Sequence, residues 1–388
     1  MVQRRVIRLR SVTRLAHRYK LICRPESLNL RRAKVAKEGG ECGYHQRCML
    51  VTLGANRNAV LPHPKGNPAI PRRMRYDATV HLSLGLARCC AGDALIRDRM
   101  VMTATFSVVV PTLGRSWELR RLLESLELQA FDGLEVVVVD RSSDNKISDM
   151  LSGRQWSFNL IPIRTPKILG TSYAMNTGWP RTTGPYILFA DDDCWYPPET
   201  LARVRELFTK TGGDILTGRS ESKSLGRYEK KAQPITRRNV WTTSIEWMMF
   251  FRREVVEAVD GYDPTIGLGA DTPWQSAPGQ DIVLRALQKG FRGYFDPSLY
   301  GFHPEVNTIE PDAAMCTKAR AYGRGMGYIL RRHRFGIAEV AHWIARPSAA
   351  AALYYVKGQR QRASYYLNMA HGRFEGWCSN AELPALRT

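Results

Sequence analysis

The stretch YILFADDDCWYPP, residues 186–198, decides how the rest of the chain is interpreted. Its first five residues form an apolar run that is typical of a strand buried on both faces. Asp191, Asp192 and Asp193 follow at the carboxyl end of that strand. Because three adjacent anions repel one another, a folded protein that keeps them there needs a counter-charge, most simply a divalent cation. The stretch therefore predicts a metal site, the alternative being an acidic loop that only solubilises a strand end.

The expected metal is Mg²⁺ or Mn²⁺. Carboxylate oxygens favour these hard cations over zinc. Magnesium is usually held by one or two protein carboxylates, while phosphate oxygens of a substrate fill other positions around it. The three aspartates therefore also indicate a phosphorylated ligand.

The residues before this stretch alternate between predicted strand and predicted helix. Buried strands are expected over residues 106–110 and 134–139, with an amphipathic helix over 116–129 between them. Two strands joined in this way form a right-handed parallel unit, and ligands of open α/β sheets bind at the carboxyl ends of the strands. Asp140 ends the second strand and is a candidate for contact with a nucleoside, although a plain turn would also explain the Ser and Asp residues that follow.

Three further polar residues are candidates for the same site. Neither a P-loop nor a GxGxxG fingerprint occurs, so a phosphate must be held differently, and we expect Asn176 on a short helical segment to point at the site. Asp281 begins a predicted helix, where it is either an N-cap or a general base presented at the mouth of the site. His303 follows a predicted strand over 291–295 and could complete a metal shell, although a lone histidine is more often structural.

The charge of the chain is concentrated in its first quarter. The 388 residues have a net charge of +21, and residues 1–101 contain 21 Lys and Arg against 6 Asp and Glu. This segment shows no sustained helical or strand period, so we predict a disordered or artefactual extension, with a transit peptide or a nucleic-acid-binding arm as alternatives. The expected organisation is thus an extension over 1–101, a catalytic domain over 102–310 and a helical extension over 311–388.

Cysteine content and hydropathy bear on the compartment. Five of the eight cysteines lie in the first quarter, none of them in a zinc-binding spacing, and no secretory signal is apparent. No stretch reaches the roughly 18 apolar residues that a membrane-spanning helix needs. We therefore expect a cytoplasmic protein. Aromatic and basic residues alternate in the C-terminal helices, which indicates either a peripheral contact with the inner face of the membrane or ordinary helix packing.

Residues 105–304 resemble a family 2 glycosyltransferase, because four segments occur in the order typical of that family. They are FSVVVPTLGR at 106–115, VVVVDRSSDN at 136–145, GPYILFADDDCWYPP at 184–198 and GLGADTPWQSAPGQDIVLRALQKGF at 267–291. The resemblance implies the glycosyltransferase A fold, a Rossmann-like α/β sheet flanked by helices. It also implies inverting transfer of a sugar from a nucleotide-diphosphate sugar to a hydroxyl acceptor, which would be a glycan, a polysaccharide or a lipid-linked saccharide.

The resemblance also assigns roles to individual residues. Pro111, Thr112 and Asp140 would line the nucleoside pocket, and the aspartates at 191–193 would bind the ribose and the metal on the diphosphate. Asp281 would be the catalytic base. His303 loosely matches a histidine near the metal in some members. The chain departs from the family pattern in three places, with Arg141 for a second aspartate, Met175 for an arginine and Gln280 for an acid before Asp281.

Two other functions are considered. A sequence pI near 9.9 is compatible with a nucleic-acid-binding protein, but the charge does not lie on a recognisable binding module. A nucleotidyltransferase would share the metal and the nucleotide, but the chain lacks a suitable triphosphate loop rich in Gly and Lys. Nucleic acid is therefore not the expected partner.

Overall fold

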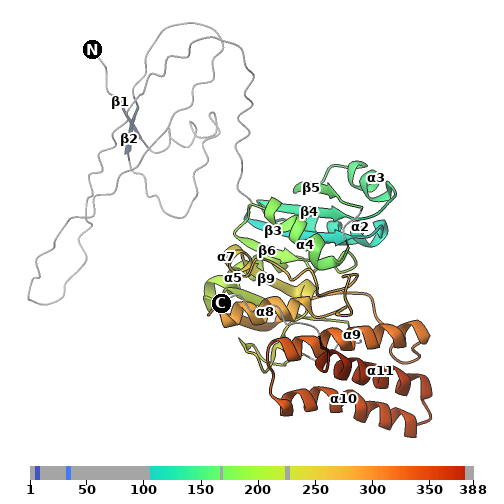
Figure 1. The fold of residues 1–388 in the computed structure, drawn as a ribbon. Helices are drawn as coiled ribbons and strands as arrows, with labels where there is room; N and C mark the ends of the chain where they lie inside the picture. The colour runs from blue at the N-terminus through green and yellow to red at the C-terminus, as the bar shows by residue number, and fades with distance from the viewer. Residues whose placement is uncertain (1–4, 9–31, 36–104, 167–168, 223–227, 381–388) are drawn as a thin grey trace, which may run out of the picture. The chain divides into compact units, whose positions relative to one another are not determined.

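The computed structural model describes residues 5–8, 32–35, 105–166, 169–222 and 228–380 (Figure 1). The chain divides into two compact units, Met1–Asp98 and Arg99–Thr388. In the first unit β1 (Arg5–Arg8) pairs antiparallel with β2 (Arg32–Val35). Apart from these two strands, the predicted disordered extension over 1–101 lies outside the described residues.

The second unit is built on an eight-stranded sheet with the order β5-β4-β3-β6-β9-β7-β10-β8. Strands β5, β4, β3 and β6 are parallel neighbours, whereas β9 runs antiparallel between β6 and β7. The strands are β3 (Phe106–Thr112), β4 (Leu134–Asp140), β5 (Asn159–Arg164), β6 (Tyr186–Phe189), β7 (Ile215–Ser220), β8 (Gln233–Ile235), β9 (Met249–Arg252) and β10 (Gly293–Gly301). The predicted α/β class is confirmed.

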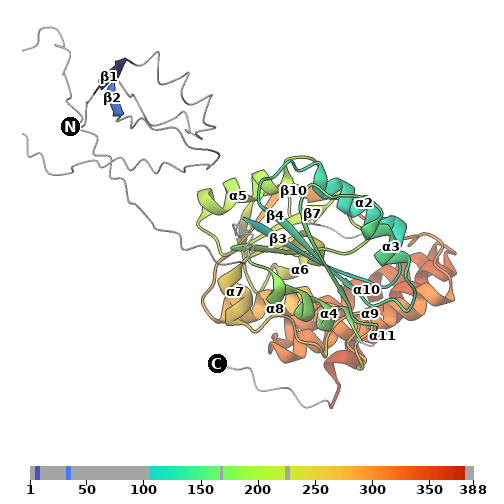
Figure 2. The ribbon, with the colours of Figure 1, turned by 90° about the horizontal axis from the view of Figure 1, so that it is seen from above.

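Helices cover both faces of this sheet (Figure 2). On one face Val108 and Val110 pack with apolar residues of α2 and α5, and on the other Val109 belongs to a cluster that includes α7 and α8. Strands β3 and β4 are buried at every position because both of their faces are covered. The helices are α2 (Ser116–Glu127), α3 (Lys146–Ser152), α4 (Thr171–Gly178), η1 (Trp179–Arg181), α5 (Thr200–Thr211), α6 (Val240–Thr243), η2 (Glu246–Met248), α7 (Arg253–Ala258) and α8 (Pro278–Gln288).

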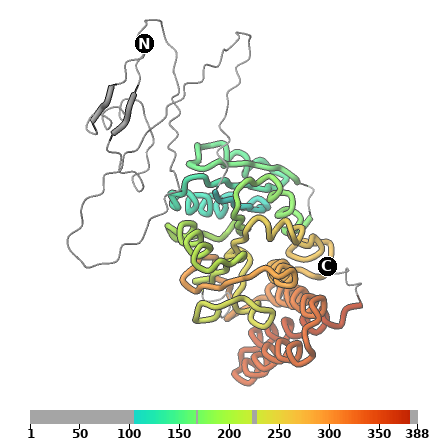
Figure 3. Tube along the Cα trace, turned by 90° about the vertical axis from the view of Figure 1, so that its left-hand side faces the viewer, coloured from blue at the N-terminus to red at the C-terminus, as the bar shows by residue number. Residues whose placement is uncertain are grey.

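Three longer helices complete the unit, which confirms that the C-terminal region is helical. They are α9 (Ala313–Arg332), α10 (Ile337–Val356) and α11 (Arg360–Trp377), and α11 lies between the other two (Figure 1). Together they lie at the end of the unit away from β3 to β5 (Figure 3). Among the described helices, none combines the length and the hydropathy that a membrane-spanning segment needs.

Helix α9 is part of the main core. Tyr328, Ile329 and Leu330 are buried in the apolar cluster that contains β9 and α8. Because α9 packs into that cluster, the core continues across the predicted boundary between residues 310 and 311. The division into two domains at that point stays a prediction. Removal of the whole C-terminal region would expose core residues.

Candidate active site

The parallel strands end at one edge of the sheet and bring the predicted polar residues together there. Thr112 at the end of β3 pairs in register with Asp140 at the end of β4. Ala190 continues β6 by donating its N–H to Val109 O at 3.0 Å, and the three aspartates follow. This convergence is the one expected for ligand sites of parallel α/β sheets.

A tight turn spreads the three carboxylates in different directions. The backbone N and Sγ of Cys194 both approach Asp191 O, at 3.2 and 3.0 Å. Asp192 is buried and accepts a hydrogen bond of 2.7 Å from Thr112 Oγ1, which ties the turn to β3. Asp191 keeps part of its surface exposed.

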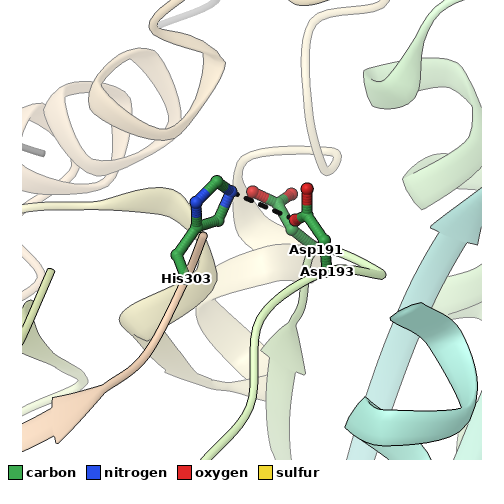
Figure 4. A group of neighbouring side chains, drawn as sticks. All are labelled: Asp191, Asp193 and His303. Carbon is green, nitrogen blue, oxygen red and sulfur yellow. Dashed lines mark ion pairs between the residues drawn. The ribbon is translucent and has the colours of Figure 1, made fainter. Parts of the chain in front are cut away.

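His303 reaches the aspartates through a short bridge beyond β10. Trp195 and Phe302 exchange backbone hydrogen bonds of 3.0 and 2.9 Å, so the segment after β10 runs beside the acidic turn. The Nε2 atom of His303 lies 3.1 Å from Asp193 Oδ1. Ligand atoms of Asp191, Asp193 and His303 all lie within 4.8 Å of one another, and the side chains face each other (Figure 4).

The donor set of this group suits a divalent cation. Asp193 Oδ1 is buried, and its partner among the described residues is His303 Nε2 at 3.1 Å, so these two atoms face each other as ligand atoms that a cation could share. His303 Nδ1 lies 3.0 Å from Pro304 O, and donation of an Nδ1 proton to that carbonyl would leave Nε2 free to bind a metal. We call Asp191, Asp193 and His303 the carboxylate–histidine group.

The titration of the group shows an unbalanced negative charge. Burial and the charge of Asp193 raise the pKa of Asp191 to about 6. Burial alone would also raise the pKa of Asp193, but the hydrogen bond and charge of His303 outweigh it and lower that pKa. Burial would lower the pKa of His303, and the bond to Asp193 raises it instead. The protein thus offsets the repulsion more fully at Asp193 than at Asp191.

Arg115 supplies a second counter-charge that the sequence did not predict. Its guanidinium forms ion pairs with Asp192 and Asp193, while half of its side-chain surface remains exposed. Arg121 supports the same turn by donating to Asp193 O at 2.7 Å. Arg115 ends the motif at 106–115, but nothing in the spacing indicates that its side chain reaches acids 77 and 78 residues further along the chain.

The comparisons with known proteins agree with this geometry. The sequence profile of the family described as "Glycosyl transferase family 2" matches residues 107–259. A protein from Haemophilus influenzae named "Uncharacterized glycosyltransferase" is 32% identical over 232 residues, covering 56% of this chain and 75% of the relative. The chain belongs to glycosyltransferase family 2. It is therefore a glycosyltransferase with the glycosyltransferase A fold, and the expected resemblance is confirmed.

Two further similarities were found for this glycosyltransferase. Glycosyltransferase AglE from Haloferax volcanii is 26% identical over 265 residues, covering 63% of this chain and 82% of AglE. Among solved structures, a mannosyltransferase from Pyrobaculum calidifontis in complex with GDP-Man and Mn²⁺ superposes with a TM-score of 0.48 and 15% identity. That superposition covers 71% of this chain and 88% of the mannosyltransferase. Family membership supports a nucleotide-sugar as the donor of the glycosyl group.

The residues predicted to bind the nucleoside lie at the expected edge of the sheet, with one exception. Pro111 and Thr112 are buried at the end of β3, and Asp140 Oδ1 accepts hydrogen bonds from Ser142 N and Oγ at 2.9 and 2.6 Å. Asn176 is the exception, because its side-chain amide forms two hydrogen bonds with the backbone of Tyr262. Asn176 Nδ2 donates to Tyr262 O at 2.6 Å, and Tyr262 N donates to Asn176 Oδ1 at 2.9 Å. The expectation that this side chain points at the site is therefore not met.

Asp281 is not placed at the mouth of the site. Its side chain has no exposed surface, and its oxygens lie 2.7 Å from Arg285 Nε, 2.9 Å from His333 Nε2 and 3.2 Å from Arg332 Nε. Burial would raise the pKa of Asp281, but the bond from His333 and the charges of the two arginines lower it to about 2. Ala277 holds the N-cap position of α8, and Asp281 lies in the first turn of that helix, so its expected place near the amino terminus is confirmed while the N-cap role is not. The base role of Asp281 stays a prediction that this geometry does not favour.

Two titratable side chains near the aspartates were missed. Glu246 in η2 lies close enough to Asp191 for the two charges to affect each other, and Tyr322 on α9 interacts electrostatically with both residues. Glu246 stands in an apolar and aromatic segment, so no pattern around it indicates a site. Tyr322 comes from the C-terminal region, so α9 brings a titratable side chain within electrostatic range of Glu246 and Asp191.

Proposed function

We propose that this protein is a metal-dependent, inverting glycosyltransferase that moves a sugar from a nucleotide-diphosphate sugar to a hydroxyl acceptor. The observation that carries the proposal is the carboxylate–histidine group at the carboxyl end of β6, beside Thr112 and Asp140. A glycan, a polysaccharide or a lipid-linked saccharide would serve as acceptor. The alternatives, a nucleic-acid-binding protein and a nucleotidyltransferase, are not favoured by the family.

Asp191, Asp193 and His303 would hold the cation. A bound Mg²⁺ or Mn²⁺ would stabilise the negative charge that develops on the departing diphosphate. Two carboxylates suit either ion, and the imidazole nitrogen favours Mn²⁺ because magnesium takes oxygen ligands. Arg115 pairs with Asp192 and Asp193, and its half-exposed side chain leaves a cation available to a phosphate.

The nucleoside would lie along the ends of β3 and β4. Pro111 and Thr112 would form one wall of its pocket, while Asp140 and Asp192 would accept hydrogen bonds from donors on the base and the ribose. Asn176 would act on this pocket indirectly, because its two bonds to Tyr262 fix the turn after α7 against α4. Single displacement from the face opposite the diphosphate would invert the anomeric centre.

A screen of nucleotide sugars tests this proposal. We expect one class of UDP- or GDP-linked sugar to raise the melting temperature in the presence of Mn²⁺, because a ligand that binds only the folded state stabilises it by about 2.7 kcal/mol at 100 times its Kd. The same sugar with EDTA should give a much smaller shift. Release of the nucleoside diphosphate in the same wells measures turnover. Equal shifts with and without the metal would contradict metal dependence.

We further propose that the tip of the α10–α11 hairpin touches the cytoplasmic face of a membrane, where a lipid-linked acceptor would be available. Tyr355 and Val356 are 66% and 84% exposed at the end of α10, and the exposed Lys357 and Arg360 follow them. No acidic residue occurs between residues 340 and 374. Exposed apolar side chains followed by cations are suited to an anionic lipid surface, where each cation contributes about 1 kcal/mol.

Flotation with anionic vesicles checks the membrane contact. The double substitution Tyr355→Ser and Val356→Ser should lower the bound fraction by at least about tenfold, because burial of each side chain contributes about 1.5–3 kcal/mol. Turnover in the absence of vesicles should not change. Leu128→Ser, which alters an exposed leucine after α2, serves as the matched control. If the double variant floats as well as the control, the hairpin tip is not the contact.

A further inference from the structure

Glu246 occupies a distinctive position among the acids of the active site. Its carboxylate Oε1 accepts a hydrogen bond of 3.3 Å from Gly279 N in the first turn of α8. The residue keeps part of its surface exposed, and among the described residues no Lys, Arg or His forms an ion pair with it. Its ability to accept a proton is therefore not used up by a neighbouring cation.

The neighbouring acids of α8 and of the turn after β6 already have partners. Asp281 is surrounded by Arg285, Arg332 and His333. Asp192 is paired with Arg115, and the carboxylate–histidine group is assigned to the cation. Among these acids of η2, α8 and the turn after β6, Glu246 is thus the one whose carboxylate is neither paired with a cation nor assigned to the proposed metal.

The fold holds Glu246 firmly in this place. A Cβ at Gly279 would overlap Glu246 Cγ and approach Met249 Cε to 2.9 Å, so a glycine is required where α8 passes the glutamate. The next residue, Trp247, is buried and stacks on the His303 ring with centroids 5.8 Å apart. The short η2 turn therefore fixes the glutamate relative to a residue of the proposed metal site.

We propose that Glu246, and not Asp281, is the general base of the transfer, an inference that rests on the proposed function. The carboxylate of Glu246 accepts the proton of the acceptor hydroxyl while that oxygen bonds to the anomeric carbon. The bond from the anomeric carbon to the diphosphate oxygen breaks, and its electron pair leaves with the nucleoside diphosphate. The proton on Glu246 then passes to solvent.

The electrostatic surroundings agree with this role. Burial and the charge of Asp191 raise the pKa of Glu246 to about 8, so its carboxylate is a stronger base than that of an ordinary glutamate. Tyr322 on α9 also has a raised pKa, because of burial and then the charges of Glu246 and Asp191. Neutralisation of Asp191 would remove part of the repulsion and favour the ionised form of Glu246.

The test compares Glu246→Gln with the wild-type enzyme, using the sugar nucleotide that stabilises the protein most in the Mn²⁺ screen and water as acceptor. A glutamine amide oxygen can still accept the bond from Gly279 N, so a purely structural role would survive the change. We expect release of the nucleoside diphosphate to fall by about 10²–10⁴-fold, while the Kd for the donor and the melting temperature remain those of the wild type. Glu257→Gln, on the exposed face of α7, is the matched control.

Other outcomes overturn the assignment. Wild-type turnover in Glu246→Gln would exclude Glu246 as the base, and a parallel loss of donor binding would make it a binding residue. Asp281→Asn is measured at a temperature where circular dichroism shows it folded. If it loses turnover per folded molecule while Glu246→Gln keeps it, Asp281 is the base. Failure of the proposed function would look different, because the wild-type enzyme itself would neither bind nor cleave any donor.

Discussion

Replacement of Asp193 by Asn lowers sugar transfer by about a thousandfold, if Asp193 holds a catalytic cation as proposed. The cation would supply several kcal/mol of transition-state stabilisation, and each 1.36 kcal/mol corresponds to a tenfold change in rate. An asparagine keeps the shape of the side chain but is a far weaker metal ligand. Steady-state turnover with saturating Mn²⁺ and the donor found in the screen is the measurement.

The fold should survive this change. Asp193 is held by Arg115, whose other partner Asp192 remains in the variant, so the guanidinium does not become a buried unpaired charge. Glu257→Gln again provides the control for removal of one negative charge. If Asp193→Asn retains full turnover in a buffer treated with chelator, the metal site is refuted.

Asp281→Asn should have the largest effect on stability. Its carboxylate is completely buried among Arg285, Arg332 and His333, and Arg332 and His333 are themselves almost inaccessible to solvent. Removal of one member of a buried charged network typically costs about 3–5 kcal/mol, because the remaining charges are left uncompensated. Urea unfolding at neutral pH measures the loss. A change of less than about 1 kcal/mol would show that the network does not stabilise the fold.

The pH dependence of stability gives an independent check on the same residue. The pKa of Asp281 is about 2 in the folded protein and 3.8 in an ordinary aspartate. A depressed folded-state pKa means that the stabilisation is present above about pH 4 and is lost as the pH falls toward 2. This single group contributes on the order of 2 kcal/mol to the free energy of unfolding. This part of the acid destabilisation should be missing in Asp281→Asn, and identical acid profiles for both proteins would contradict the assignment.

Much of the sheet could be predicted because its central strands carry their own signal. The valine runs of β3 and β4 are apolar at every position, which only a strand covered on both faces allows. The amphipathic pattern of α2 was equally clear, and its leucines are buried as expected. The end of β10 was harder to predict, since this strand runs to Gly301 with an irregularity between Phe295 and Tyr300.

The residues of the proposed metal site could be predicted only as residue types. Three aspartates after a strand indicate a cation, but the meeting of Asp193 with His303 depends on the bridge between Trp195 and Phe302, residues more than a hundred positions apart. Nothing local to His303 distinguishes it from a structural histidine. It was proposed on its position after a strand and on the resemblance.

Some polar residues have surroundings other than those predicted, because their hydrogen-bond and ion-pair partners are distant in sequence. Asp281 looked available because its partners include Arg332 and His333, and His333 lies 52 residues further along the chain. Asn176 looked free because its partner Tyr262 lies 86 residues away. Glu246 was not predicted as a site residue, because a single acid in an apolar and aromatic segment forms no recognisable motif. Local patterns show which residues are polar, but long-range packing decides which of them remain available for chemistry.

The central claim is that Asp191, Asp193 and His303 hold a divalent cation at the carboxyl end of β6. Isothermal titration of Mn²⁺ into the full chain, with the nucleoside diphosphate of the selected donor present, measures this directly. We predict one site in the wild-type protein and a loss of at least about tenfold in affinity for both Asp193→Asn and His303→Ala, as for removal of groups around other protein metal sites. Unchanged Mn²⁺ affinity in both variants would contradict the account.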